Sequence, residues 1–208
     1  MNFKKNNLIF GTITGLIAVI IIGFVMKPGF YFPKARDSEV PPALVGGPYE
    51  LTDHKGNLTR PEDFRGKIML VYFGYSFCPD VCPTDLQKIT IALDILEEKN
   101  IDISLIQPIF ITIDLERDSQ DIIAEFVSNF HSSLIGLTGT QAQIKKAASA
   151  YRVYYQKAGN SEDEYYLMDH SSLVYVMGAN GLYLSHFSSL DSPKGIAERL
   201  VGYLKDLN

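Results

Sequence analysis

Short apolar runs alternate along the chain with segments whose apolar residues recur at helical spacing. The runs at residues 68–73, 103–113 and 134–137 predict strands, and amphipathic stretches at residues 84–99 and 119–130 separate them. In the first amphipathic stretch, leucine and isoleucine recur every three or four residues, which indicates a helix with one buried face. The resulting β-α-β-α-β order predicts an α/β fold whose sheet contains parallel strand pairs.

Capping residues mark three further helix starts. Asp118 or Ser119 is suited to cap the second helix, and Thr140 with Gln143 has the pattern of a capping box. A last helix is expected to begin at Ser192-Pro193, because proline favours the first helical position.

Three more apolar runs follow the third helix, at residues 165–168, 171–177 and 182–187. A turn rich in glycine and asparagine joins the last two, which predicts an antiparallel hairpin. Because this hairpin follows the parallel part of the chain, the sheet should be mixed.

The N-terminal part of the chain has a different character from the rest. Residues 6–26 are uncharged and strongly apolar, and about 20 such residues suffice to cross a bilayer. They predict a membrane anchor at residues 1–26; the alternative, a cleaved signal peptide, fits less well because no small-x-small cleavage pattern follows. Residues 27–48 are rich in proline and glycine, as in an extended stalk, and residues 49–208 form the predicted domain.

Composition narrows the function classes. The chain has 208 residues, of which 46% are hydrophobic and 21% charged, as in a globular domain with an added segment. Its net charge is −5 and it has no basic stripe, so nucleic-acid binding is not expected. An N-terminal anchor preceded by a short cytoplasmic segment normally exports the remainder of the chain. The N-terminal segment lacks the Arg- and Ser-rich composition of a mitochondrial leader, which favours a bacterial protein. We therefore expect a single-pass protein of a bacterial inner membrane, with its domain in the periplasm.

The two cysteines of the chain, Cys78 and Cys82, lie between the first predicted strand and the first predicted helix. A disulfide that closes so short a loop contributes roughly 2 kcal/mol, against about 4.7 kcal/mol for a 100-residue loop, so stability is a poor reason for the pair. Two thiols at this spacing suit the binding of one soft metal ion or dithiol exchange. In an open α/β sheet, reactive groups gather at this position, beyond the carboxyl ends of the strands.

The start of the predicted helix affects both thiols. Pro83 is suited to the first helical position, which makes Cys82 the expected N-cap. Unpaired N–H groups and the positive end of the helix dipole favour thiolate there, so the pKa of at least one cysteine should be lowered. The carboxylate of Asp80, between the cysteines, acts against this.

Several short motifs run in order along the chain. They are DFRGK at residues 63–67, LVYFGY at 70–75, CPDVCPT at 78–84, IDLERD at 113–118, LTG at 137–139 and DHS at 169–171. Together they cover about residues 50–187 and strongly resemble the Sco/SenC family of copper-binding proteins. Ser76 and Leu115 depart from the family pattern, where threonine and proline are expected, and neither changes metal-ligand chemistry.

The resemblance implies a thioredoxin-like domain with a central mixed sheet, tethered to a membrane. It implies copper as the bound metal, Cu(I) or Cu(II), with Cys78, Cys82 and His170 as ligands by position. Its implied role is assembly of the dinuclear copper centre of cytochrome c oxidase, with the copper-centre subunit and a copper donor protein as partners. Two thiolates and an imidazole form a soft set suited to Cu(I). Zinc stays an alternative, although a closed tetrahedral zinc site needs a second histidine.

Other candidate residues have simpler explanations. Asp169 could orient His170, but neighbours on a strand point to opposite faces. Helix capping and a local ion pair explain most of the acidic and basic residues at 114–118. Three histidines have no supporting pattern and are expected to be structural: His54, His131 and His186.

Three functions are compatible with the cysteine pair. The first is a copper metallochaperone. The second is a thiol:disulfide oxidoreductase that reduces the copper-ligand cysteines of the oxidase subunit, with Cys78 or Cys82 as the redox-active nucleophile. The third is peroxide or redox sensing, for which no basic partner is readable. The pair has one more intervening residue than the Cys-x-x-Cys of thioredoxins, which favours metal binding.

Overall fold

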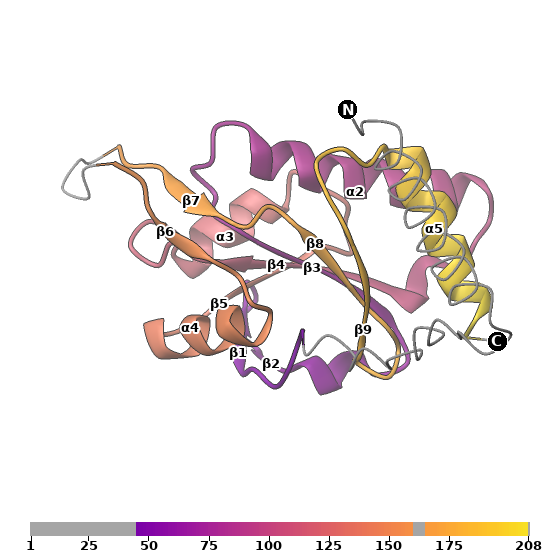
Figure 1. The fold of residues 1–208 in the computed structure, drawn as a ribbon, viewed down its shortest axis with the longest axis horizontal. Coiled ribbons are helices and arrows are strands. Elements are labelled where there is room, and N and C mark those ends of the chain that lie inside the picture. Colours follow the sequence, from indigo (N-terminus) through magenta and orange to yellow (C-terminus); the bar gives the residue numbers. More distant parts are fainter. Residues whose placement is uncertain (1–44, 160–164, 208) are drawn as a thin grey trace, which may run out of the picture. The chain divides into compact units, whose positions relative to one another are not determined.

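The computed structural model describes residues 45–159 and 165–207. Within them helices flank a seven-stranded sheet, and a separate two-stranded sheet extends away from it (Figure 1). The strands are β1 (Leu51–Asp53), β2 (Leu58–Thr59), β3 (Ile68–Gly74), β4 (Ile106–Thr112), β5 (Ile135–Thr138), β6 (Tyr155–Lys157), β7 (Met168–His170), β8 (Val174–Met177) and β9 (Tyr183–Phe187). The helices are α2 (Val81–Glu98), α3 (Gln120–Val127), α4 (Gln141–Ala150) and α5 (Pro193–Lys205), with short 3-10 turns η1 (Pro61–Phe64) and η2 (Ile103–Leu105).

The large sheet is mixed, as predicted. Its strand order is β2-β1-β5-β4-β3-β8-β9. The pairs β3–β4 and β4–β5 are parallel, whereas β1 and β8 join their neighbours antiparallel. All residues of β3 and β4 are buried, as expected of parallel strands covered on both faces. The predicted β-α-β-α-β order and α/β class are therefore confirmed.

Helices pack on the sheet through the apolar faces seen in the sequence. The buried side of α2 includes Leu86, Ile89, Leu93 and Leu96, and α2 packs against α5 (Figure 1). Helix α3 lies on β5 at Gly136, where two side chains of α3 leave no room for a Cβ atom.

The first helix begins earlier than predicted. Its first residue is Val81 and its N-cap is Asp80, so the prediction that Cys82 is the N-cap is wrong. Pro83 is the third helical residue, which is tolerated because the N–H groups of the first turn have no partner within the helix. The first backbone bond of the helix runs from the N–H of Thr84 to the carbonyl of Asp80. Cys82 therefore lies inside the first turn.

Strand boundaries also differ from the sequence pattern. Residues 103–105 form a 3-10 turn rather than strand, because the Asp102 side chain accepts a hydrogen bond from the N–H of Ser104 at 2.9 Å. The strand predicted at residues 165–168 is instead β7, Met168–His170. Strand β6 and the β1–β2 hairpin were not predicted: they are two or three residues long and partly exposed, too short for a clear alternating pattern.

The predicted caps and the C-terminal hairpin are confirmed. Ser119 caps α3, Thr140 and Gln143 form a capping box at α4, and Ser192 caps α5 ahead of Pro193. Strands β8 and β9 pair antiparallel across the predicted turn.

The predicted anchor at residues 1–26 lies outside the described residues, as does most of the predicted stalk at 27–48. The last stalk residues, 45–48, adjoin the domain, where the N–H of Gly46 donates to the carbonyl of Ala150 at 2.9 Å. In residues 45–159 and 165–207 no helix is both long and apolar enough to cross a membrane.

Candidate metal centre

The three predicted ligands come from three separate elements. Cys78 lies in the loop that follows β3, Cys82 is the second residue of α2, and His170 ends β7, 88 positions further along the chain. The cysteines are therefore at the carboxyl end of a central strand, as the sequence predicts for a reactive group.

The structure brings the three side chains into contact. The Sγ atom of Cys82 lies 3.5 Å from Nε2 of His170. The backbone N–H of Cys82 points to Sγ of Cys78 at 3.4 Å, and the N–H of Cys78 donates to the carbonyl of Tyr75 at 3.3 Å. Cys82 is fully buried, Cys78 is partly exposed, and both are free thiols.

Gly74, the last residue of β3, makes room for the buried thiol. A Cβ atom there would lie 2.9 Å from Sγ of Cys82, 2.9 Å from Cε1 of Tyr72 and 3.1 Å from Cε2 of Phe110. Real Cβ atoms do not approach other atoms within 3.0 Å. The absence of a side chain at Gly74 thus allows α2 to place its cysteine directly against the strand end.

Backbone and aromatic contacts orient the imidazole of His170. Its Nδ1–H donates to the carbonyl of Ser171 at 3.2 Å, which leaves the lone pair of Nε2 directed at Cys82. The ring of Tyr72 lies edge-on to the imidazole at 6.2 Å between centroids, and the ring of Tyr75 does so at 6.0 Å. Asp169 is exposed, so the orienting partner is the Ser171 carbonyl.

The two thiols have opposite proton affinities. The pKa of Cys78 lies well below its ordinary value, chiefly because the Cys82 thiol donates a hydrogen bond to it. The N–H of Cys82 lowers this pKa further, whereas burial acts in the opposite direction. The pKa of Cys82 is raised, because its proton is held by Cys78 and because it is buried. The lowered pKa of Cys78 agrees with the expectation that at least one cysteine is acidic. The backbone N–H that helps to lower it is that of Cys82, in the first turn of α2.

A buried polar chain behind Cys82 was missed by the sequence analysis. The hydroxyl of Tyr72 lies 3.5 Å from the carboxylate of Asp85, which pairs with Nζ of Lys88 at 3.4 Å. Asp85 is buried, and burial raises its pKa despite Lys88. A signal was present, because Asp85 precedes Ile89 by four residues and so falls on the buried stripe of α2.

The acidic segment at residues 114–118 has a larger role than local capping. Asp118 does not cap α3, since Ser119 does. Its buried carboxylate instead accepts bonds from Ser76, two residues before Cys78, and from Thr112. The predicted ion pair is present, with Nε of Arg117 2.6 Å from Asp114.

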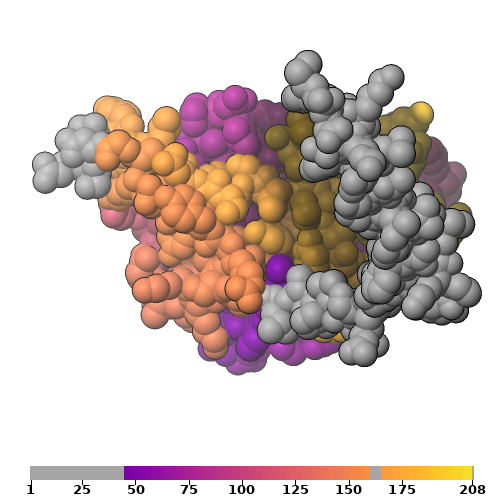
Figure 2. Space-filling view, in the orientation of Figure 1, coloured from indigo at the N-terminus to yellow at the C-terminus, as the bar shows by residue number. Residues whose placement is uncertain are grey.

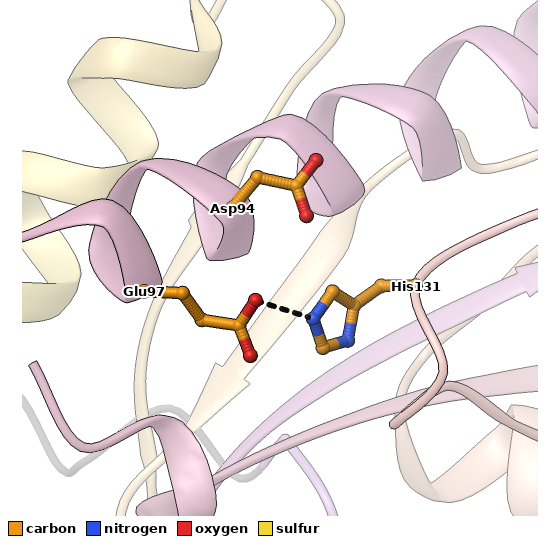
Figure 3. Close-up of side chains that lie close together, drawn as sticks. All are labelled: Asp94, Glu97 and His131. Carbon is orange, nitrogen blue, oxygen red and sulfur yellow. Dashed lines mark ion pairs between the residues drawn. The ribbon is translucent and has the colours of Figure 1, made fainter. Parts of the chain in front are cut away.

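Another group of possible metal ligands lies between α2 and the loop that follows α3. Candidate ligand atoms of Asp94, Glu97 and His131 lie within 4.8 Å of one another (Figure 3). However, Nδ1 of His131 accepts a hydrogen bond from the N–H of Ser133 at 3.2 Å, which places the imidazole proton on Nε2, 3.6 Å from Glu97. A proton on Nε2 that faces the Glu97 carboxylate explains the approach of these two side chains without a metal ion.

The other two histidines are also engaged elsewhere. Nδ1 of His54 accepts from the N–H of Gly136 at 3.1 Å, and Nδ1 of His186 lies 2.7 Å from the hydroxyl of Tyr183. All four histidines are among the described residues, and the contacts found for these three lie away from the cysteines. The donors that meet at the cysteine pair are thus two sulfurs and one imidazole nitrogen, a soft set that suits copper better than a closed four-ligand zinc site.

Comparisons with known proteins identify the family of this chain. A model of the SCO1/SenC family matches residues 37–205. The SCO2-like protein of Rickettsia felis is 43% identical over 159 residues, which is 76% of this chain and 76% of that protein. Arabidopsis thaliana ScoI, solved with copper bound, has a TM-score of 0.71 and 35% identity over 78% of this chain and 99% of its own. Bradyrhizobium japonicum ScoI, also solved with copper bound, has a TM-score of 0.70 and 38% identity over 76% of this chain and 99% of its own. The chain therefore belongs to the SCO1/SenC family.

Proposed function

We propose that this chain is a copper metallochaperone that binds one copper ion through Cys78, Cys82 and His170. Its role would be to assist assembly of the dinuclear copper centre of cytochrome c oxidase. The observation that carries the proposal is the 3.5 Å contact between Sγ of Cys82 and Nε2 of His170, two residues far apart in sequence. Copper bound in the two ScoI relatives supports the choice of metal.

The chemistry of the three side chains suits a cargo that must be held and then released. Cys78 supplies a ready thiolate at the partly exposed edge of the site. Cys82 contributes a second thiolate once its proton leaves, so binding should release a proton. His170 already presents a lone pair, because its other nitrogen is bonded to Ser171. A low-coordinate set of soft ligands permits transfer by ligand exchange with thiolates of a partner.

The expected setting of this activity is the periplasmic side of a bacterial inner membrane. Residues 1–26 would anchor the chain, residues 27–48 would form a stalk, and residues 49–208 would carry the site. The partners would be a copper donor protein and the oxidase subunit that receives the metal. The Rickettsia relative supports a bacterial setting.

A thiol:disulfide oxidoreductase is the second candidate, favoured by the unequal acidity of the two cysteines. Here the Cys78 thiolate attacks a disulfide of the oxidase subunit and forms a mixed disulfide. Cys82 then displaces the second sulfur of the target. The target leaves as a dithiol, while Cys78 and Cys82 are oxidised to a disulfide.

An anaerobic Cu(I) titration of the full-length chain, against a competing chelator, tests the first candidate. One copper should bind per chain, and Cys82→Ser or His170→Ala should each weaken binding, whereas His186→Ala serves as a matched control and should not. Failure of the fully reduced wild type to compete for copper would overturn the metallochaperone.

Reduction of a target-peptide disulfide distinguishes the second candidate. For an oxidoreductase, Cys78→Ser abolishes reduction and His170→Ala leaves it nearly intact, because the imidazole takes no part in dithiol exchange. For a metallochaperone, both substitutions damage copper delivery.

A further inference from the structure

His170 lies on a hairpin that is not hydrogen-bonded into the large sheet. Among the described residues, β6 and β7 pair only with each other, with Tyr155 opposite His170. Figure 1 shows this hairpin extending away from the seven-stranded sheet, and Figure 2 shows it on the surface beside α4. A two-stranded hairpin is marginally stable by itself. Apart from the short connection to β8, the position of His170 relative to the cysteines therefore depends on side-chain contacts.

Arg117, from the loop after β4, makes several of these contacts. Its Nη1–H donates to the carbonyl of Tyr166 at 2.8 Å, and its guanidinium carbon lies 3.7 Å from the centroid of the Tyr166 ring. Tyr166 is buried and precedes β7 by two residues. The guanidinium thus holds both the backbone and the ring of the segment that leads to His170.

Asp114 completes this attachment. Its carboxylate is 2.6 Å from Nε of Arg117 and also accepts a hydrogen bond from the Tyr166 hydroxyl at 2.6 Å. Tyr166 is therefore held at its carbonyl, its ring and its hydroxyl by one ion pair. A second ion pair, between Lys157 of β6 and Glu116 at 2.7 Å, joins the other strand to the same loop.

The other side of Arg117 faces the cysteine loop. Its guanidinium carbon lies 5.1 Å from the centroid of the Phe77 ring and 5.6 Å from that of Tyr75. Phe77 directly precedes Cys78, and the Tyr75 ring is edge-on to His170. One guanidinium thus touches the segments that carry both kinds of ligand.

The buried ion pair of Arg117 and Asp114 is a poor way to stabilise the fold. The side chains of Arg117 and Asp114 are 16% and 2% exposed, and a buried ion pair contributes little net stability compared with apolar packing. In addition, Nη2 of Arg117 is buried without a hydrogen-bond partner among the described residues. A buried N–H group without a partner is better explained by the position that the guanidinium must keep than by a contribution to stability.

We propose that Arg117, oriented by Asp114, is a positioning residue that fixes the His170 hairpin against the cysteine loop and so sets the copper-binding geometry. This inference rests on the proposed function. It also assigns a specific role to the IDLERD motif at residues 113–118, which contains both Asp114 and Arg117.

The domain offers a matched control for Arg117. Arg199 also pairs with an aspartate, since its guanidinium lies 3.3 Å from the carboxylate of Asp191. It donates a hydrogen bond to the backbone carbonyl of His186 at 3.2 Å. Its guanidinium carbon lies 4.3 Å from the centroid of the Phe187 ring. Its partners belong to β9 and the start of α5. The pair of variants Arg117→Lys and Arg199→Lys keeps the charge at each position and removes the planar fork.

The test compares these variants in the full-length chain by Cu(I) affinity, the Cu(II)–thiolate absorption band and the thermal midpoint. Arg117→Lys should weaken Cu(I) binding by about 10- to 100-fold, as for other residues that orient metal ligands, and should shift the band. Arg199→Lys should lower the thermal midpoint yet leave both copper readouts unchanged. In the metal-free chain, Arg117→Lys should also speed amide exchange at Ala158 and Ser171, whose N–H groups hold the hairpin together.

If Arg117→Lys prevents folding, Tyr166→Phe provides the second test, since it removes only the bond to Asp114. A smaller loss of affinity and a shifted band are expected for it. Wild-type affinity and an unshifted band in the Arg117→Lys or Tyr166→Phe chain would overturn the positioning role. Absence of copper binding by the wild type would instead overturn the proposed function.

Discussion

The carboxylate of Asp118 holds Ser76 in the cysteine loop by two hydrogen bonds. The Ser76 hydroxyl donates to it at 2.5 Å and the Ser76 backbone N–H at 3.1 Å. A third bond comes from the hydroxyl of Thr112, the last residue of β4. Because β3 and β4 are parallel neighbours, the loops that follow them lie side by side, and Asp118 joins them.

Asp118→Ala should therefore destabilise the domain. It leaves the N–H of Ser76 and two hydroxyls without their acceptor in a buried place, which should lower the free energy of unfolding by about 1.5–3 kcal/mol. Burial raises the pKa of Asp118, which means that the ionised carboxylate carries a desolvation cost in the folded state. The loss of unfolding free energy should therefore lie near the lower end of this range. Urea unfolding of the metal-free chain measures it.

Asp94→Ala is the control for this loss, since Asp94 is exposed on α2. Surface substitutions of this kind change the free energy of unfolding by no more than about 0.5 kcal/mol. Equal unfolding midpoints for the two variants would show that the Asp118 bonds contribute nothing.

Gly74→Ala should displace the thiol of Cys82. The new methyl group meets Cys82, Tyr72 and Phe110 at distances too short to be kept, and all three are buried. Overpacking of this kind costs about 1–3 kcal/mol. We also expect weaker Cu(I) binding, because the shift of Sγ alters its 3.5 Å contact with His170.

Gly202→Ala is the matched control and should have the opposite sign. Gly202 lies within α5, and a Cβ atom there meets nothing within 4 Å. Alanine in a helix interior is favoured over glycine by about 0.5–1 kcal/mol. If Gly74→Ala were as stable as Gly202→Ala, with wild-type copper affinity, the steric role of Gly74 would be rejected.

Alkylation should distinguish the two cysteines of the metal-free chain. Cys78 is partly exposed and its pKa is lowered, so iodoacetamide should modify it at a rate that changes little from about pH 8 to about pH 6. Cys82 is buried with a raised pKa and should stay unmodified. Peptide mass spectrometry measures both. A rate at Cys78 that falls about tenfold per pH unit, as for an ordinary thiol, would contradict the lowered pKa.

The location of the cysteine pair could be predicted from sequence because the signals for it are local. An apolar strand ends at Gly74, and a helical stripe follows Pro83, so the pair had to lie between a strand and a helix. The exact helix start could not be fixed, since proline is allowed throughout the first turn. Asp80 rather than Cys82 is the N-cap for this reason.

The meeting of His170 with Cys82 could not be derived from local pattern. The two residues are 88 positions apart, and only the family resemblance paired them before the fold was known. The support around them was only partly visible: Asp114 and Arg117 pair within one loop, but Tyr166, which both of them bind, comes from a segment 49 positions beyond Arg117. Local rules identify caps, stripes and an ion pair three residues apart, whereas the attachment of a distant segment to that pair depends on the whole fold.

Asp191 should give the domain a measurable pH dependence. Hydrogen bonds from the backbone N–H and hydroxyl of Ser188, together with Arg199, lower the pKa of this carboxyl below its ordinary value. Because the folded-state pKa lies below that of the unfolded chain, the ionised group contributes stability above the unfolded pKa. This contribution is lost as the pH falls through the folded pKa. Asp191→Asn should therefore lower the free energy of unfolding by about 1 kcal/mol at neutral pH, a modest value because the pair is partly exposed.

The difference between wild type and Asp191→Asn should begin to narrow as the pH falls below about 4, where the carboxyl of the unfolded chain becomes protonated, and should close once the folded-state carboxyl is protonated as well. Urea midpoints of both chains at a series of pH values measure this difference. Asp206→Asn provides the comparison, since it removes one exposed carboxylate at the opposite end of α5 from Asp191. A difference between wild type and Asp191→Asn that stayed constant down to the lowest pH would mean that the Ser188 bonds do not depend on the charge. In that case the lower stability of Asp191→Asn would come from an amide that fits the Ser188 bonds poorly, and not from the missing charge.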